Sequence, residues 1–115
     1  MSATRADVAA RLMELIGHLQ AAEEEACQAG IDLATAKEGL EGAEAARTLG
    51  GLEGKNAEER KAFLFLFTQE HRDAHQAAQE AHQRAAMRLR VLTAEASILK
   101  VVGHLIAREE EEARP

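Results

Sequence analysis

Three histidines have a spacing that suits metal chelation. His71, His75 and His82 are four and seven residues apart. At about 100° per residue on an α-helix, their side chains point within about 40° of one another. Two histidines one turn apart can bind zinc, and Cys27 or Asp32 on a facing helix could complete the coordination. The compact His-Glu-x-x-His motif is absent, so polar packing at a helix interface is the simpler interpretation.

Two further features invite a catalytic or nucleotide-binding interpretation. Cys27 lies in the middle of a predicted helix with no base beside it in a recognisable pattern, which argues against a nucleophile. The glycines before Lys55 precede a helix, as in a phosphate-binding loop, but the Gly50–Gly54 spacing is one residue too short. Asn56 also replaces the required Ser or Thr, and no strand precedes the loop. The sequence therefore predicts a protein that is not an enzyme and holds no cofactor.

Charge is unevenly distributed along a chain whose formal net charge is −6. Residues 1–56 hold five basic and ten acidic side chains, whereas residues 60–108 hold eight basic and four acidic ones. Two interpretations stay open: an acidic helix complements a basic one, or the basic residues contact a phosphate backbone. Single-strand binders usually add aromatic platforms, and here the only aromatics are three clustered phenylalanines. The candidate phosphate contacts are Arg60, Lys61, Arg72, Arg84, Arg88, Arg90 and Lys100.

The composition predicts helices and association. Hydrophobic residues make up 46% of the 115 residues, but aromatics only 3%, and much of the remainder is alanine. Alanine buries little area, so the core of a monomer would be thin, and we expect a homo-oligomer. The single cysteine excludes an internal disulfide framework. We see no signal peptide and no apolar run of the roughly 18 residues that a membrane span needs, so we expect no membrane contact.

The first half of the chain carries a long heptad pattern. Thr4 is a plausible N-cap, with Asp7 three residues later. From Val8 onward, apolar residues recur in alternating steps of four and three for about five heptads, which predicts one helix over residues 5–47. The members of this seam are Val8, Leu12, Leu15, Leu19, Ala22, Ala26, Ala29, Leu33, Ala36, Leu40 and Ala43.

The second half predicts another long helix. Residues 48–55 contain three glycines and form a connector. Asn56 is a good N-cap, and Glu59 can reach back in a variant of the capping box. No proline follows before Pro115, which favours a single helix over residues 57–112. Its apolar seam needs a stutter near residue 88 and contains Phe67, His71, Ala74, Ala78, Ala81, Ala85, Leu92, Leu99 and Ile106.

Folding the chain back at the connector brings two alanine-rich zones together. Ala22 then lies opposite Ala81, and Ala29 opposite Ala74. Small residues on both faces let helices approach closely, so we predict an all-α fold, an antiparallel helical hairpin of two long, coiled-coil-like helices. The predicted packing residues are Leu12, Leu19, Ala22, Ala26, Ala29, Leu33, Leu40, Ala74, Ala78, Ala81, Ala85 and Leu92.

Two segments carry more apolar surface than a hairpin can bury. Residues 62–67 are apolar all round the helix, and so are most of residues 98–106, which we expect to extend beyond the start of the first helix. We predict that both segments form oligomer or partner interfaces. The candidate interface residues are Phe63, Phe65, Phe67, Leu99, Val102, Leu105 and Ile106.

The segment from Leu52 to Ala62 is similar to part of small helical-hairpin proteins encoded by bacteriophages. In those proteins a Gly-Lys-Asn-Ala-Glu-Glu-Arg segment, here residues 54–60, links a first helix to a second. The resemblance implies an accessory role in phage replication or recombination, contact with single-stranded DNA or with replication and recombination proteins, and a location in the cytoplasm of a bacterial host. The alternatives are a structural or adaptor coiled coil that binds only proteins, and a small metal-binding helical protein.

Overall fold

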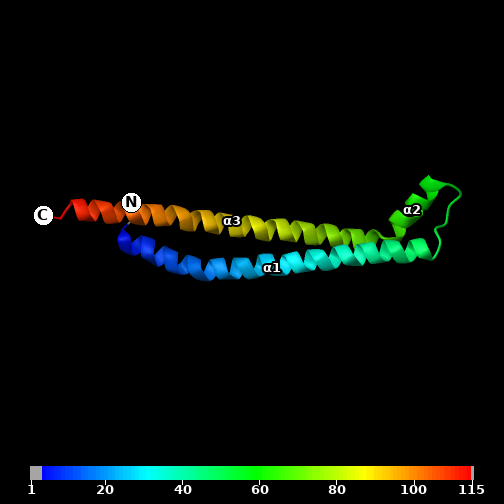
Figure 1. Cartoon of the computed structure of the whole chain (residues 1–115), viewed down its shortest axis with the longest axis horizontal. Coiled ribbons are helices and arrows are strands. Elements are labelled where there is room, and N and C mark those ends of the chain that lie inside the picture. Colours follow the sequence, from blue (N-terminus) through cyan, green and yellow to red (C-terminus); the bar gives the residue numbers. More distant parts are fainter. Residues whose placement is uncertain (1–3, 115) are drawn as a thin grey trace. The chain divides into compact units, whose positions relative to one another are not determined.

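The computed structural model describes residues 4–114 and contains two long helices and one short one (Figure 1). Helix α1 spans Arg5–Leu49, α2 spans Ala57–Phe67, and α3 spans Gln69–Glu112. Helices α1 and α3 pack antiparallel and are joined through a loop and α2. This confirms the predicted all-α helical hairpin.

The chain forms two compact units, and the boundary between them falls inside both long helices. Unit 1 contains residues 4–26 of α1 together with residues 85–114 at the end of α3. Unit 2 is the stretch Cys27–Arg84, which holds the rest of α1, the loop, α2 and the beginning of α3. Within each unit, a part of α1 runs antiparallel to a part of α3.

The heptad seam predicted for α1 is confirmed along its whole length. All eleven of its members, from Val8 to Ala43, are buried or half-buried. The helix begins with a reciprocal capping box, because the Thr4 hydroxyl accepts a hydrogen bond from the Asp7 N–H at 3.1 Å while the Thr4 N–H donates to the Asp7 carboxylate at 3.0 Å. Sequence spacing was sufficient here because alternating steps of four and three place all these residues on one helix face.

The loop before α2 is fixed by a cap and by a glycine. The Asn56 side chain accepts from the Glu59 N–H at 2.9 Å, as predicted, and the Glu59 carboxylate reaches back to the Lys55 N–H at 2.7 Å. Gly54 has φ of +144°, and a Cβ there would lie only 2.8 Å from the Arg60 nitrogen and from the Glu59 Cβ. The turn therefore folds tightly against the first turn of α2, and only glycine fits at position 54.

The prediction of one unbroken helix over residues 57–112 is wrong, because the helix is interrupted at Thr68. This residue is 2% exposed and has φ −104° and ψ 9°. Its N–H makes the usual helical bond to the Leu64 carbonyl, and its hydroxyl donates to the same carbonyl at 2.8 Å, a local bond of the kind that bends helices. The Arg72 guanidinium donates to the Phe65 carbonyl, which a continuous helix would offer to the Gln69 N–H. Helix α2 consequently diverges from the line of α3 (Figure 1).

The predicted register between the helices is also wrong, by roughly two helical turns. Instead of Ala29 facing Ala74, Gly30 lies against the His82 ring at 3.8 Å. Ala74 is exposed, which corrects its predicted packing role. Because α2 is a separate helix in the connection, antiparallel pairing starts later in the sequence than a simple fold-back assumes. The two alanine-rich zones match equally well at several offsets, so the sequence did not show that the predicted register was wrong.

The buried face of α3 follows one uninterrupted heptad pattern, so the predicted stutter near residue 88 does not occur. Phe67 and His71, at the start of the predicted seam, are exposed, whereas Ala78, Ala85 and Leu92 belong to the buried face as predicted. The steps alternate three and four throughout, and the members are buried or half-buried. They are His75, Ala78, His82, Ala85, Leu89, Leu92, Ala96, Leu99, Gly103 and Ile106.

The corrected register changes the position of the last apolar segment. Residues 98–106 do not extend past the start of α1; Gly103 instead lies opposite Val8, whose Cγ1 would be 3.5 Å from a Cβ at residue 103. Val8 and Leu15 are the largest apolar side chains fully buried in unit 1. One side of this segment therefore packs on the first turns of α1.

Candidate functional site

Two of the three histidines lie against glycines of α1. The ring of His82 covers Gly30, and Nδ1 of His71 would lie 3.7 Å from a Cβ on Gly39. His75 is half-buried on the same side of α3 as His82. Within residues 4–114, no group of three or more His, Cys, Asp or Glu side chains is arranged to hold a metal ion. The spacing that suggested zinc is thus used for packing, with two rings filling the space that the glycines leave.

The seven basic residues predicted to contact phosphates do not form one continuous exposed surface within either unit. Arg72 and Arg88 are engaged within the chain, the first over Phe65 and the second with the Glu25 carboxylate at 3.4 Å. Lys100 is exposed beside an apolar groove that Leu12 and Leu99 also line. The remaining four are exposed and are divided between the units: Arg60, Lys61 and Arg84 in unit 2, and Arg90 in unit 1.

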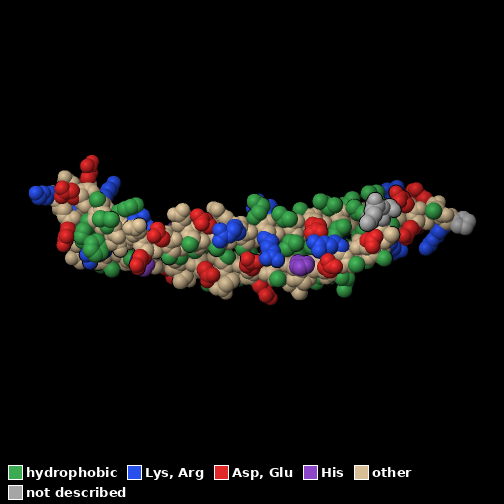
Figure 2. All heavy atoms as spheres, turned by 180° about the vertical axis from the view of Figure 1, so that it is seen from behind, with side chains coloured by type: hydrophobic (Ala, Val, Ile, Leu, Met, Phe, Trp, Pro, Cys, Tyr) green, Lys and Arg blue, Asp and Glu red, His purple; other side chains and the backbone are tan. Residues whose placement is uncertain are grey.

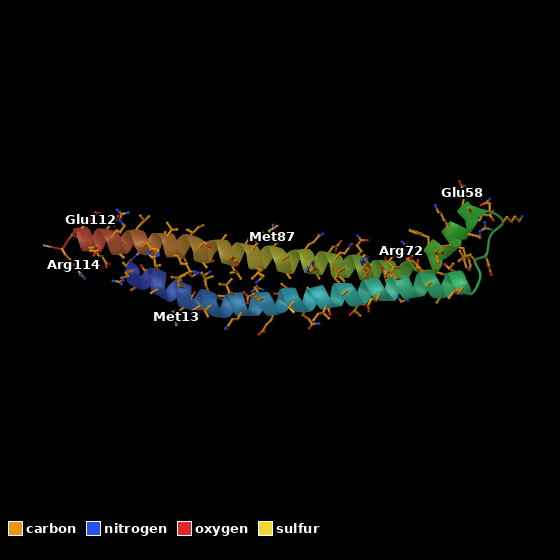
Figure 3. All side chains as sticks on the ribbon, viewed as in Figure 1. Met13, Glu58, Arg72, Met87, Glu112 and Arg114 are labelled. Atoms are coloured by element: carbon orange, nitrogen blue, oxygen red, sulfur yellow. The ribbon has the colours of Figure 1, made fainter. Side chains whose placement is uncertain are left out.

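Arginines cover the phenylalanines at the α2 end of unit 2. The guanidinium carbon of Arg47 lies 3.7 Å from the ring centroid of Phe67 and 5.0 Å from that of Phe63. Arg72, at the start of α3 (Figure 3), has its guanidinium carbon 3.3 Å from the Phe65 ring centroid. Such cation–π contacts stabilise by about 0.5–1 kcal/mol each at exposed sites. They hold α2 against its neighbours while leaving much apolar surface open.

The predicted interface residues of α2 are more exposed than those of α3. Phe65 and Phe67 are 59% and 55% exposed, and Leu66 between them is 68% exposed. Phe63 is half-buried against Phe67, with ring centroids 4.4 Å apart. Of the predicted interface residues in α3, only Leu105 is more than half exposed. The other three are half-buried: Leu99, Val102 and Ile106.

A second apolar strip on α3 was not recognised in the sequence. Its residues recur in alternating steps of four and three, like those of the buried face, but they lie on the opposite side of the helix and are all exposed. Figure 2 shows hydrophobic side chains along this outer margin of α3, and Figure 3 shows Met87 pointing away from α1. We call this surface the outer strip; it consists of Met87, Val91, Ala94, Ile98, Val101 and Leu105.

The spacing of the outer strip was present in the sequence, but it could be separated from the packing face only when the register was known. With the seam started at Phe67 and His71, the predicted packing and exposed faces of α3 were mixed. Starting the seam at His75 assigns every large apolar residue from Met87 to Leu105, except Val102, to one of two opposite faces.

A bidentate ion pair in unit 1 was also missed. Arg11 Nε lies 2.7 Å from one oxygen of Glu95, and a terminal nitrogen of Arg11 donates to the other oxygen at 3.0 Å. Arg11 also donates to Glu14 at 2.9 Å. The hydrogen bond from Arg11 holds the pKa of the Glu95 carboxyl below its ordinary value, and the same bond raises the pKa of Arg11. This pair joins α1 to α3 within unit 1.

Comparison with protein-family models, with curated proteins and with solved structures gave no significant match. Across residues 4–114, none of the three helices combines the length and the hydropathy required to cross a bilayer. Function must therefore be argued from the surfaces of the chain itself.

Proposed function

We propose that the protein is a non-enzymatic assembly protein, a helical hairpin that associates with further copies of itself through apolar surface. The observation that carries the proposal is the imbalance between buried and exposed apolar side chains. Within the described residues, only two apolar side chains larger than alanine are buried, Val8 and Leu15. Twelve large ones are more than half exposed, on all three helices.

The thin core supports association on energetic grounds. Burial of apolar surface contributes about 25 cal/mol per Å², and three of the five buried apolar residues between α1 and α3 are alanines, which supply little of it. Exposed patches of contiguous apolar side chains usually mark interaction sites in proteins that stay in solution. A second copy offers the same patches, so symmetric association buries them on both chains at once.

A concentration series of thermal melts tests this proposal. Association with the folded state raises the melting temperature as protein concentration rises, because mass action favours the assembled form. We expect a rise of several degrees over a roughly hundredfold range of concentration. A melting temperature independent of concentration would contradict self-association, and the exposed surface would then belong to a different protein partner, as an adaptor would use it.

Contact with single-stranded DNA, and with it a role in phage replication or recombination, is the second candidate. Its support is limited to the exposed cations on α2 and α3 and to the resemblance around residues 54–60. Fluorescence anisotropy with a labelled single-stranded oligonucleotide tests it. Binding that weakens steeply with salt would indicate phosphate contacts. No binding at low salt would remove this candidate and leave assembly as the function.

A further inference from the structure

We infer that the outer strip of α3 is the surface through which two copies pair, and that the two α3 helices run antiparallel in that pair. This inference rests on the proposed self-association and assigns it a surface and an orientation. Each of the five large residues of the strip is more than half exposed, from Leu105 at 54% to Ile98 at 63%. The strip lies within unit 1.

The periodicity of the strip matches a helix–helix interface. Steps of four and three residues recur without exception from Met87 to Leu105. At 1.5 Å per residue the strip extends for roughly 27 Å along α3. A helix that carries heptad patterns on two opposite faces needs two helical partners, one for each face. Helix α1 occupies the face of Ala85, Leu92 and Leu99, so the other face needs a helix from outside the chain.

Charges at the two ends of the strip favour a second copy and set its direction. Residues 80–90, around the beginning of the strip, hold Arg84, Arg88 and Arg90 against Glu80, whereas residues 102–112, around its end, hold Glu109 to Glu112 against Arg108. Antiparallel pairing of two strips places the net basic segment of each copy against the net acidic segment of the other, with Arg84 coming opposite Arg108. Parallel pairing places like charges side by side, which is destabilising.

Some of these charged side chains make only weak ion pairs, or none, within the described part of the chain. Arg88 is 3.4 Å from Glu25 and Arg5 is 3.3 Å from Glu110, and in both pairs each side chain is about half exposed or more. Exposed pairs of this kind contribute little on their own. Arg84 and Arg90 are exposed on α3 and make no ion pair within the described residues. Of the two, Arg84 can contact acidic residues of a second copy, because antiparallel pairing brings it beside Glu109.

The apolar side chains also fit an antiparallel register. When the strip is paired with itself in full, Met87 of one copy faces Leu105 of the other, and Val91 faces Val101. Ala94 then faces Ile98, so the smallest residue of the strip lies opposite one of the largest. The alternation of small and large side chains across the interface allows them to interdigitate.

A matched pair of substitutions tests the surface. Ile98→Glu places a charge in the centre of the strip, and Ile31→Glu makes the same change at a residue of α1 that is 54% exposed and lies outside it. We expect I98E to weaken association by at least about tenfold and I31E to leave it near wild type. Both residues are exposed, so circular dichroism should show unchanged helix content in both variants.

The outcomes separate this inference from the proposed function. If wild type associates and I98E associates equally well, the outer strip is not the interface, although self-association stands. If I31E dissociates the assembly and I98E does not, the inference is overturned in the same way. If wild type stays monomeric, both the proposed function and the inference fail.

Cysteine crosslinking tests the orientation. The exposed Cys27 is first replaced by serine, so that no other thiol reacts. In an antiparallel pair, the double variant V91C/V101C forms a covalent dimer on mild oxidation, and V91C alone does not. A covalent dimer from V91C alone would show that the helices run parallel and would overturn the proposed orientation.

Discussion

Different interactions hold each of the two units together internally. All four ion pairs found among residues 4–114 lie in unit 1, and the strongest by geometry is the bidentate contact of Arg11 with Glu95. All three arginine–phenylalanine contacts and the tilted Phe63–Phe67 ring pair lie in unit 2. Unit 1 also holds both of the buried apolar side chains larger than alanine, Val8 and Leu15.

This difference shows how each unit determines its register. Large side chains and a forked arginine–carboxylate contact fit in one alignment only, so unit 1 is specified along its length. The facing surfaces of unit 2 consist mostly of alanines, glycines and imidazole rings, with only Leu33 and Leu40 as larger aliphatic side chains, so we expect them to tolerate sliding by a turn. Unit 2 depends instead on its end, where Thr68 interrupts the helix and arginines cover the phenylalanines.

The largest expected effect comes from removing the best-buried side chain of unit 1. Leu15 is 1% exposed, and Leu15→Ala should lower the free energy of unfolding by roughly 2–4 kcal/mol through lost burial and the cavity left behind. Leu40→Ala in unit 2 is the matched control, because Leu40 is only half-buried, and it should cost less. Urea denaturation of both variants measures the difference, and equal losses would contradict the contrast between the units.

A smaller loss is expected from the turn of unit 2. Gly54→Ala introduces a Cβ against backbone atoms at a φ that L residues rarely adopt, and should cost about 1–3 kcal/mol. Gly42→Ala is the control, since a Cβ at Gly42 meets nothing within 4 Å, and it should stabilise the helix. Thermal melting compares the two. An unchanged midpoint for G54A would mean that the loop does not hold unit 2 in place.

Acid should weaken unit 1 through Glu95. Because the pKa of Glu95 is lower in the folded protein than its ordinary value of 4.5, its contribution to stability is present above that value and is lost as pH falls through the folded pKa. We expect the melting temperature to fall between about pH 5 and about pH 3. Glu95→Gln should melt lower at neutral pH and decline less steeply in acid.

Asp7 has a similarly lowered pKa, caused by its bonds with Thr4, so some acid sensitivity remains in the Glu95→Gln variant. Glu14→Gln is the control, because Glu14 contacts Arg11 only within α1 and does not join the two helices. We expect its pH profile to stay close to that of wild type. Identical pH profiles for wild type and E95Q would show that the bidentate pair does not stabilise unit 1.

The smallest expected effect is a gain. A Cβ at Gly30 would lie 3.8 Å from the His82 ring, an ordinary van der Waals distance, so Gly30→Ala should stabilise unit 2 by about 0.5–1 kcal/mol through helix propensity. Gly17→Ala in unit 1, where the space is open, should give a similar gain. A loss at Gly30 with a gain at Gly17 would indicate that the helices of unit 2 approach more closely than the structure shows.

Local signals in the sequence were sufficient for the elements but not for their alignment. The spacing from Val8 to Ala43 gave the buried face of α1, and Asn56 with Glu59 gave the start of α2, because both depend on neighbours within one or two turns. The interruption at Thr68, where Arg72 reaches back to the Phe65 carbonyl, is not marked by a glycine or a proline in the sequence. Alanine zones that match at several offsets could not distinguish Ala29 facing Ala74 from the observed contact of Gly30 with His82.

The same ambiguity hid the outer strip. Its residues and those of the buried face recur with one period on one helix, so the two sets could be distinguished only after the register assigned Leu99 and Ile106 to the side of α1. Leu105 was the one member of the strip predicted as interface. The contact between Arg11 and Glu95 could not be predicted either, because the two residues are far apart in the sequence and come together only in the correct register.

The central claim, that this hairpin assembles with itself, is tested most directly by its mass in solution. One chain has a mass of 12.5 kDa. Sedimentation equilibrium over a range of micromolar concentrations should give a mass of twice that value or a higher multiple, and the mass should fall in the Ile98→Glu variant. A wild-type mass that stays at that of a single chain at every concentration would contradict the account.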